Sequence, residues 1–78
     1  MRDFIWFKGK SSKGKPGYWL KFAYDEETIA LLKDTIPRYL REWNSDNKKW
    51  WVSELCEKQI NDIFPLFLQE VIAQKKLL

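Results

Sequence analysis

Tryptophan and lysine recur two residues apart at three places in this chain. The pairs are Trp6 with Lys8, Trp19 with Lys21, and Lys49 with Trp51. Each pair lies in a run of aromatic and β-branched residues, which is typical of β-strands, and residues i and i+2 of a strand share a face. Indole rings stack on bases while ammonium groups contact phosphates. One face of a sheet built from these segments is therefore expected to suit single-stranded nucleic acid.

The intervening residues then form the opposite, apolar face, which is the expected core side: Ile5, Phe7, Tyr18, Leu20, Phe22, Trp50 and Val52. On this assignment Trp50 is a core residue and its neighbour Trp51 is exposed. A different interpretation stays open, because Trp is usually mostly buried and because exposed aromatic residues also anchor protein interfaces. The same aromatic face would then serve protein interaction or homodimerisation.

Positive charge is concentrated at the N-terminal end. Residues 1–22 hold six basic residues and one acidic residue, a net charge of +5, whereas the whole chain carries +3. Clustered lysines attract polyanions. Residues 9–17, a Gly/Ser/Pro/Lys segment, read as a basic loop that either contacts phosphates or only aids solubility. The lysines of this region proposed to bind nucleic acid are Lys8, Lys10, Lys13, Lys15 and Lys21.

Several kinds of chemistry are not expected. The chain has no His and a single cysteine, Cys56, so neither a disulfide within the chain nor a His- or Cys-rich metal site is predicted. Gly9, Gly14 and Lys15 resemble a phosphate-binding loop, but Pro16 replaces its Ser or Thr and a strand follows instead of a helix. We therefore expect no enzyme activity, cofactor or metal. Neither a membrane span nor a signal peptide is recognisable, which predicts a cytoplasmic protein.

The expected elements make one small α+β domain over residues 1–78, in the order ββαββα. Asp25 is a good N-cap for a helix that ends near Thr35, before Pro37. Ser53 can cap a second helix, which Pro65 is expected to kink or break. A four-stranded, mostly antiparallel sheet with both helices on one face follows. Its strands are expected at residues 3–8, 18–23, 38–43 and 48–53.

A family resemblance emerges from the middle of the chain. The residues that carry it are Tyr24-Asp25, Ile29 to Lys33, Ile36-Pro37, Trp43-Asn44, and Lys48-Lys49-Trp50 with Val52. Together they resemble the HARP-like domain, a small ββαββα-type module found beside the motor of annealing helicases and related phage and repair helicases. The resemblance covers roughly residues 18–60.

The resemblance implies an accessory DNA-engaging role in DNA repair rather than a catalytic one. It points to Arg41, Lys48, Lys49 and Trp51 as residues that contact DNA, and it favours DNA over RNA. A helicase-type protein partner is also implied. No helicase motor accompanies the module in these 78 residues. We therefore expect a non-enzymatic module that binds single-stranded or junction DNA through its aromatic and basic sheet face, including Trp19, and through its basic loop.

Overall fold

The computed structural model describes residues 4–23 and 25–77 and confirms the expected α+β architecture, with four strands in one sheet. The predicted second helix is broken around Pro65 into two helices, as its sequence indicates. The elements in chain order are β1 (Ile5–Lys10), β2 (Pro16–Lys21), α1 (Glu26–Thr35), η1 (Arg38–Leu40), β3 (Arg41–Asn44), β4 (Lys49–Ser53), η2 (Glu54–Cys56), α2 (Glu57–Ile63) and α3 (Phe67–Leu77).

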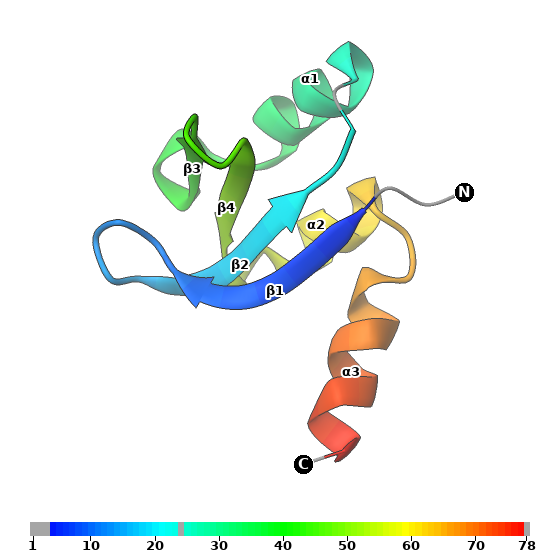
Figure 1. The fold of residues 1–78 in the computed structure, drawn as a ribbon. Coiled ribbons are helices and arrows are strands. Elements are labelled where there is room, and N and C mark those ends of the chain that lie inside the picture. The colour runs from blue at the N-terminus through cyan, green and yellow to red at the C-terminus, as the bar shows by residue number, and fades with distance from the viewer. Residues whose placement is uncertain (1–3, 24, 78) are drawn as a thin grey trace.

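The strand order is β1-β2-β4-β3, and every neighbouring pair is antiparallel. Two sequential hairpins therefore lie side by side and meet where β2 pairs with β4. In Figure 1, α2 lies behind this sheet, with α1 above it and α3 below. The loop between β1 and β2 extends away from α3 at the other end of the first hairpin (Figure 1).

The strand bounds differ from the expectation in two regions of the chain, for local reasons. The first hairpin is paired through Gly9–Gly17 and Lys10–Pro16, so its strands extend further into the basic segment than predicted. Pro16 is tolerated there because it is the first residue of its strand. Residues 38–40 form a turn of 3-10 helix instead of a strand, closed by a 2.9 Å hydrogen bond from the Leu40 amide to the Pro37 carbonyl.

The helix termini follow from side-chain caps. Asp25 accepts a 3.1 Å hydrogen bond from the Glu27 amide, which satisfies a free N–H of the first turn of α1. Ser53 accepts in the same way from the Leu55 amide, at 3.2 Å, where the second helical region begins. Asn61 on α2 accepts from the Leu68 amide of α3 at 3.1 Å, so the broken helix stays joined across the Pro65 turn.

The core fills the space between the sheet and the helices. Tyr18, Leu20 and Val52 supply the sheet side of this core. Phe67 is fully buried and makes edge-to-face contacts with the rings of Tyr18 and Trp6, at centroid distances of 5.1 and 5.2 Å. The other buried members are Leu32, Ile36, Trp50, Cys56, Ile60 and Val71.

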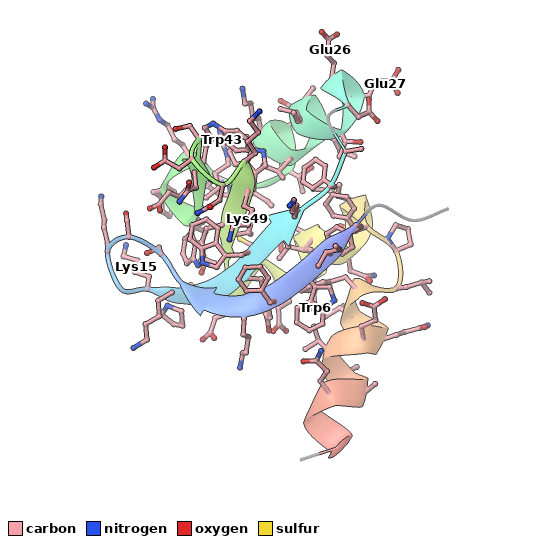
Figure 2. All side chains as sticks on the ribbon, in the orientation of Figure 1. Trp6, Lys15, Glu26, Glu27, Trp43 and Lys49 are labelled. Carbon is pink, nitrogen blue, oxygen red and sulfur yellow. The ribbon has the colours of Figure 1, made fainter. Side chains whose placement is uncertain are left out.

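The faces of β1 are the reverse of those predicted. Trp6 pairs with Leu20 across the hairpin and so shares its core-facing side, whereas Ile5 and Phe7 are 60% and 43% exposed. Trp6 gains by this arrangement because its ring packs on Phe67 and its indole nitrogen donates a 2.6 Å hydrogen bond to Glu70. Phe7, with its smaller ring and no N–H, would fill less of the space that Trp6 occupies beside Phe67. In Figure 2, Trp6 points towards α3.

Candidate nucleic-acid interface

The sheet face opposite the helices carries the residues that alternate with the core positions. We call it the open face. Phe7, Trp19, Trp51 and Glu42 lie in direct register across the four strands, so they form one row on it. The remaining large side chains of the open face are Ile5, Lys21 and Lys49.

Lys49 sits among the aromatic rings of this face. Its ammonium nitrogen lies 4.8 Å from the centroid of the Phe7 ring and 5.4 Å from that of Trp19, both within range of a cation–π interaction. Figure 2 shows Lys49 on the viewer's side of the sheet, away from the helices. The structure therefore brings together an exposed ring, a half-buried indole and a cation.

Trp51 shares this face but is not available on it. Its side chain is only 2% exposed, and its indole nitrogen donates a 3.1 Å hydrogen bond to the Gly9 carbonyl. The ring occupies the space above Gly17, where an added Cβ would lie 2.7 Å from it. The expectation that Trp51 is exposed is therefore wrong, because Gly17 leaves room for its ring and the Gly9 carbonyl accepts its N–H.

Trp19 is held in a similar way but keeps part of its surface. Its indole nitrogen donates a 3.2 Å hydrogen bond to the Lys10 carbonyl, and its Cδ1 lies 2.6 Å from the position of a Cβ on Gly9. The side chain is half-buried. Trp19 and Phe7 are consequently the two rings of the row that a ligand could reach.

The basic loop between β1 and β2 is anchored by its serines. Ser11 is buried, and its hydroxyl accepts 3.2 Å hydrogen bonds from the Lys13 and Lys15 amides. Ser12 donates a 2.8 Å hydrogen bond to Glu42 on β3, at the opposite edge of the sheet. The loop thus folds towards the open face. Its lysines remain exposed: Lys10, Lys13 and Lys15.

Three predicted contact residues lie elsewhere. Lys8 pairs with Tyr18, and Arg41 pairs with Val52, so both belong to the helix side of the sheet. The Arg41 guanidinium donates a 3.0 Å hydrogen bond to the Ile36 carbonyl, which assigns it a structural role at the end of α1. Lys48 lies in the turn before β4, beside a cavity on the helix side. The proposed set is therefore divided between two surfaces.

Sequence reasoning missed Ile5 and Phe7 by placing them in the core. The positions of the glycines indicate which residues of β1 and β2 lie on the open face. Gly9 is in phase with Phe7, and Gly17 is in phase with Trp19. Strand glycines often mark a close approach of other groups, and here they make room for indole rings on this face.

Two titratable groups are buried in the core. Burial, reinforced by a hydrogen bond donated to Glu57, raises the pKa of the Tyr18 hydroxyl well above its usual value. Burial likewise raises the pKa of the Cys56 thiol, which keeps it protonated and unreactive at neutral pH.

Within residues 4–23 and 25–77, no group of acidic, His or Cys side chains is arranged to hold a metal ion. No helix in the same ranges is long and apolar enough to cross a membrane.

Comparison with family models, curated proteins and solved structures gives no match to this chain.

Proposed function

We propose that this chain is a non-enzymatic nucleic-acid-binding module that engages single-stranded or junction DNA through its open face and basic loop. The observation that carries the proposal is the position of Lys49 over the rings of Phe7 and Trp19. A cation held between accessible rings can contact a phosphate while bases stack beside it. Aromatic stacking contributes about 1–3 kcal/mol per base in proteins that bind single strands.

The roles of the individual residues follow from their exposure. Phe7 and Trp19 supply the stacking surfaces, and Phe7 takes the role first expected of Trp51. Lys21 and Lys49 provide phosphate contacts from the face itself. The exposed lysines of the loop extend the positive surface next to it, in the part of the chain where net charge is +5 over residues 1–22.

The sequence resemblance to the HARP-like domain supports the same assignment. In that setting the module would assist a helicase-type partner in DNA repair and would prefer DNA to RNA. We place it in the cytoplasm, where its lone thiol would stay reduced.

A homodimer is the second candidate function, because Ile5 and Phe7 expose apolar surface on β1, an edge strand of the sheet. A second copy could cover these side chains and pair with the strand edge. This alternative uses the same face and would compete with nucleic acid.

Salt dependence distinguishes the two functions. We would titrate labelled single-stranded and duplex oligonucleotides with the protein at two salt concentrations, and measure the molar mass of the free protein by light scattering. Polyanion binding is expected to weaken steeply with salt, whereas apolar association barely responds. Exchanging Lys21 and Lys49 for Gln should weaken binding, while the same exchange at Lys33 and Lys58, on α1 and α2, should not. Equal losses in both variants would remove the open face from the proposal.

A further inference from the structure

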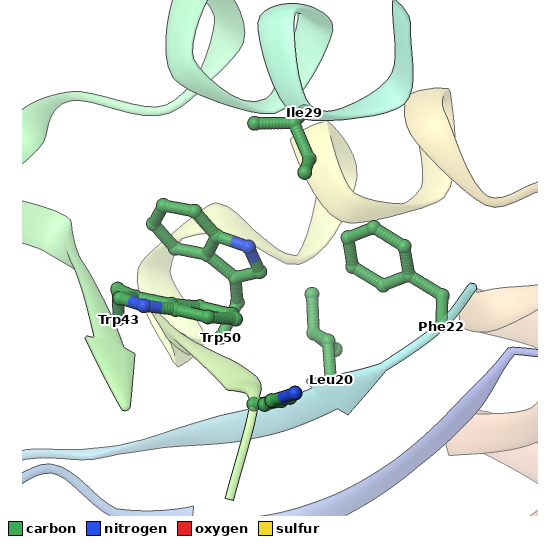
Figure 3. Close-up of a pocket in the computed structure, with 6 residues that line it drawn as sticks. Leu20, Phe22, Ile29, Trp43 and Trp50 are labelled. Carbon is green, nitrogen blue, oxygen red and sulfur yellow. The ribbon is translucent and has the colours of Figure 1, made fainter. Parts of the chain in front are cut away.

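A second surface of this molecule has the features of a binding site. A cavity of about 360 Å³ opens on the helix side of the sheet, between α1 and the β3–β4 hairpin. Figure 3 shows its walls, with Ile29 above, Phe22 on one side, Trp43 on the other and Leu20 below. Trp50 and Lys48 complete the lining. The cavity is separate from the open face, because Leu20 and Trp50 point to the opposite side of the sheet from Trp19 and Lys49.

Trp50 presents an unused hydrogen-bond donor to this cavity. Its side chain is 8% exposed, yet within the described residues its indole nitrogen donates to no acceptor, unlike those of Trp6, Trp19 and Trp51. In Figure 3 the Trp50 ring stands over Leu20 with its nitrogen turned to the side of Phe22 and Ile29. No buried side-chain nitrogen or oxygen among the described residues lacks a partner, so the unpaired Trp50 N–H reaches the solvent in the cavity. It is therefore placed to meet an acceptor on a ligand there.

Two further features of the cavity suit a ligand: the flat ring of Trp43 and the cationic side chain of Lys48. Trp43 is 47% exposed, and its ring centre lies 5.1 Å from that of Trp50 at an angle of 46°, so one side of it remains open to the cavity. Lys48 has a backbone φ of 54°, in the left-handed region that non-glycine residues seldom adopt. Its exposed side chain contributes to the cavity edge.

We propose that this cavity binds one unstacked nucleobase together with its 5′-phosphate. The base would lie against Trp43, a ring nitrogen or carbonyl oxygen of the base would accept from Trp50, and Lys48 would contact the phosphate. A purely apolar side chain of a protein partner fits less well, because it would bury the Trp50 N–H without an acceptor. The inference rests on the proposed function and extends it to a second contact on the same strand.

The two surfaces are adjacent through the chain itself. Lys48 lies at the cavity and Lys49, the next residue, lies on the open face. A single strand that passes Lys49 could therefore turn around the β3–β4 hairpin and place a following base in the cavity. An unpaired base that can leave the stack in this way is present in single-stranded and junction DNA but not inside a duplex.

The test is an NMR titration of the indole N–H signals, assigned with single Trp→Phe variants. The probes are deoxyadenosine 5′-monophosphate, 2-deoxyribose 5-phosphate, inorganic phosphate and a single-stranded tetranucleotide. We expect the deoxynucleotide to shift the Trp43 and Trp50 signals, whereas the sugar phosphate and inorganic phosphate cause no such shift. The tetranucleotide should shift the signals of both surfaces.

Substitution gives the second arm of the test. Trp43→Ala should reduce deoxynucleotide affinity at least about fivefold, in line with the loss of one base stack. Tyr39→Ala, at an exposed aromatic residue that lines neither the cavity nor the open face, should leave that affinity unchanged. Equal shifts with the base-free phosphates, shifts confined to Trp19, or an unchanged affinity in Trp43→Ala would each overturn the cavity proposal. A tetranucleotide that shifts only Trp43 and Trp50 would instead retain the cavity and remove the open face from the proposed function.

Discussion

The indole nitrogen of Trp51 donates a 3.1 Å hydrogen bond to the carbonyl oxygen of Gly9, a residue 42 positions earlier in the chain. This bond joins β4 to the edge strand β1 across the intervening strand β2. It closes the first hairpin over the Trp51 ring and leaves Trp19 and Phe7 as the accessible rings of the open face. The shape of the proposed interface therefore depends on a residue of the open face that is too buried to contact the ligand.

Trp51→Ala should destabilise the domain by about 3–5 kcal/mol, because it removes a buried ring and leaves a cavity. Trp50→Ala should cost a similar amount, since that side chain is 8% exposed. Trp43→Ala is the matched control and should cost clearly less, because its ring is 47% exposed. Urea unfolding of the three variants measures these differences. A Trp51→Ala protein as stable as the control would contradict the position of this ring.

Gly17→Ala should destabilise the protein by about 1–3 kcal/mol through overpacking. The added methyl group would lie 2.4 Å from the Val52 carbonyl oxygen and 2.7 Å from the Trp51 ring. Gly14→Ala is the control, because it tests whether alanine at any glycine of this hairpin destabilises the protein equally. Gly14 has free space around it but a φ of +79°, so its substitution should cost only about 1–2 kcal/mol through backbone strain.

Thermal unfolding measures the stability of both glycine variants, and their near-ultraviolet circular dichroism before unfolding reports on the Trp51 ring. Near-ultraviolet circular dichroism of Gly17→Ala should change because the indole must move, whereas that of Gly14→Ala should match the parent. Identical spectra and identical stabilities for the two variants would argue against close packing between Gly17 and Trp51.

Exchanging Lys10, Lys13 and Lys15 together for Gln should weaken oligonucleotide binding without unfolding the domain, because their side chains are exposed. The slope of log affinity against log salt should fall by up to about 2–3 units, roughly one for each lost phosphate contact. The control removes the same charge from exposed residues outside the sheet, at Lys33 on α1, Arg38 on η1 and Lys58 on α2. Equal slopes in the two triple variants would assign the loop to solubility alone.

Tyr18→Phe should lower stability at neutral pH by about 1–3 kcal/mol, since it removes the hydrogen bond to Glu57. The pKa of Tyr18 is raised in the folded protein, so the unfolded chain loses this proton first, near its usual pKa of about 10. The contribution is thus complete below about pH 10 and declines as pH rises further. The stability difference between parent and variant should shrink above pH 10. Parallel stability curves from pH 8 to 11 would contradict this linkage.

The sequence was sufficient for the elements that depend on local signals. Asp25, Pro37 and Pro65 determine where helices begin, end or break, and each does so in the structure. The turn after Asn44 likewise connects the second pair of strands. The Asn44 side chain accepts a 3.0 Å hydrogen bond from the Asn47 amide in this turn. These effects involve residues only a few positions apart, so a single sequence carries the information.

The faces of β1 could not be predicted in the same way. Phe4 and Trp6 alternate with Ile5 and Phe7, so both phases place large apolar residues on each side. The choice depends on Phe67 and Glu70, which lie in α3 some 60 residues later and accommodate the Trp6 ring and its N–H. The burial of Trp51 depends on distant partners as well. Six of the seven residues of the proposed interface were therefore recognisable from the sequence: Lys10, Lys13, Lys15, Trp19, Lys21 and Lys49. The exchange of Phe7 for Trp51 was not.

The central claim is that single-stranded DNA occupies the open face. Its most direct test is the NMR signal of the Trp19 indole N–H, together with those of the Phe7 ring, during titration with a single-stranded oligonucleotide at low salt. We expect both sets of signals to shift with the same affinity, accompanied by quenching of Trp fluorescence, and we expect added salt to reverse the change. Unchanged signals of Trp19 and Phe7 at oligonucleotide concentrations well above about 100 μM, the weak end of non-specific binding, would contradict the claim.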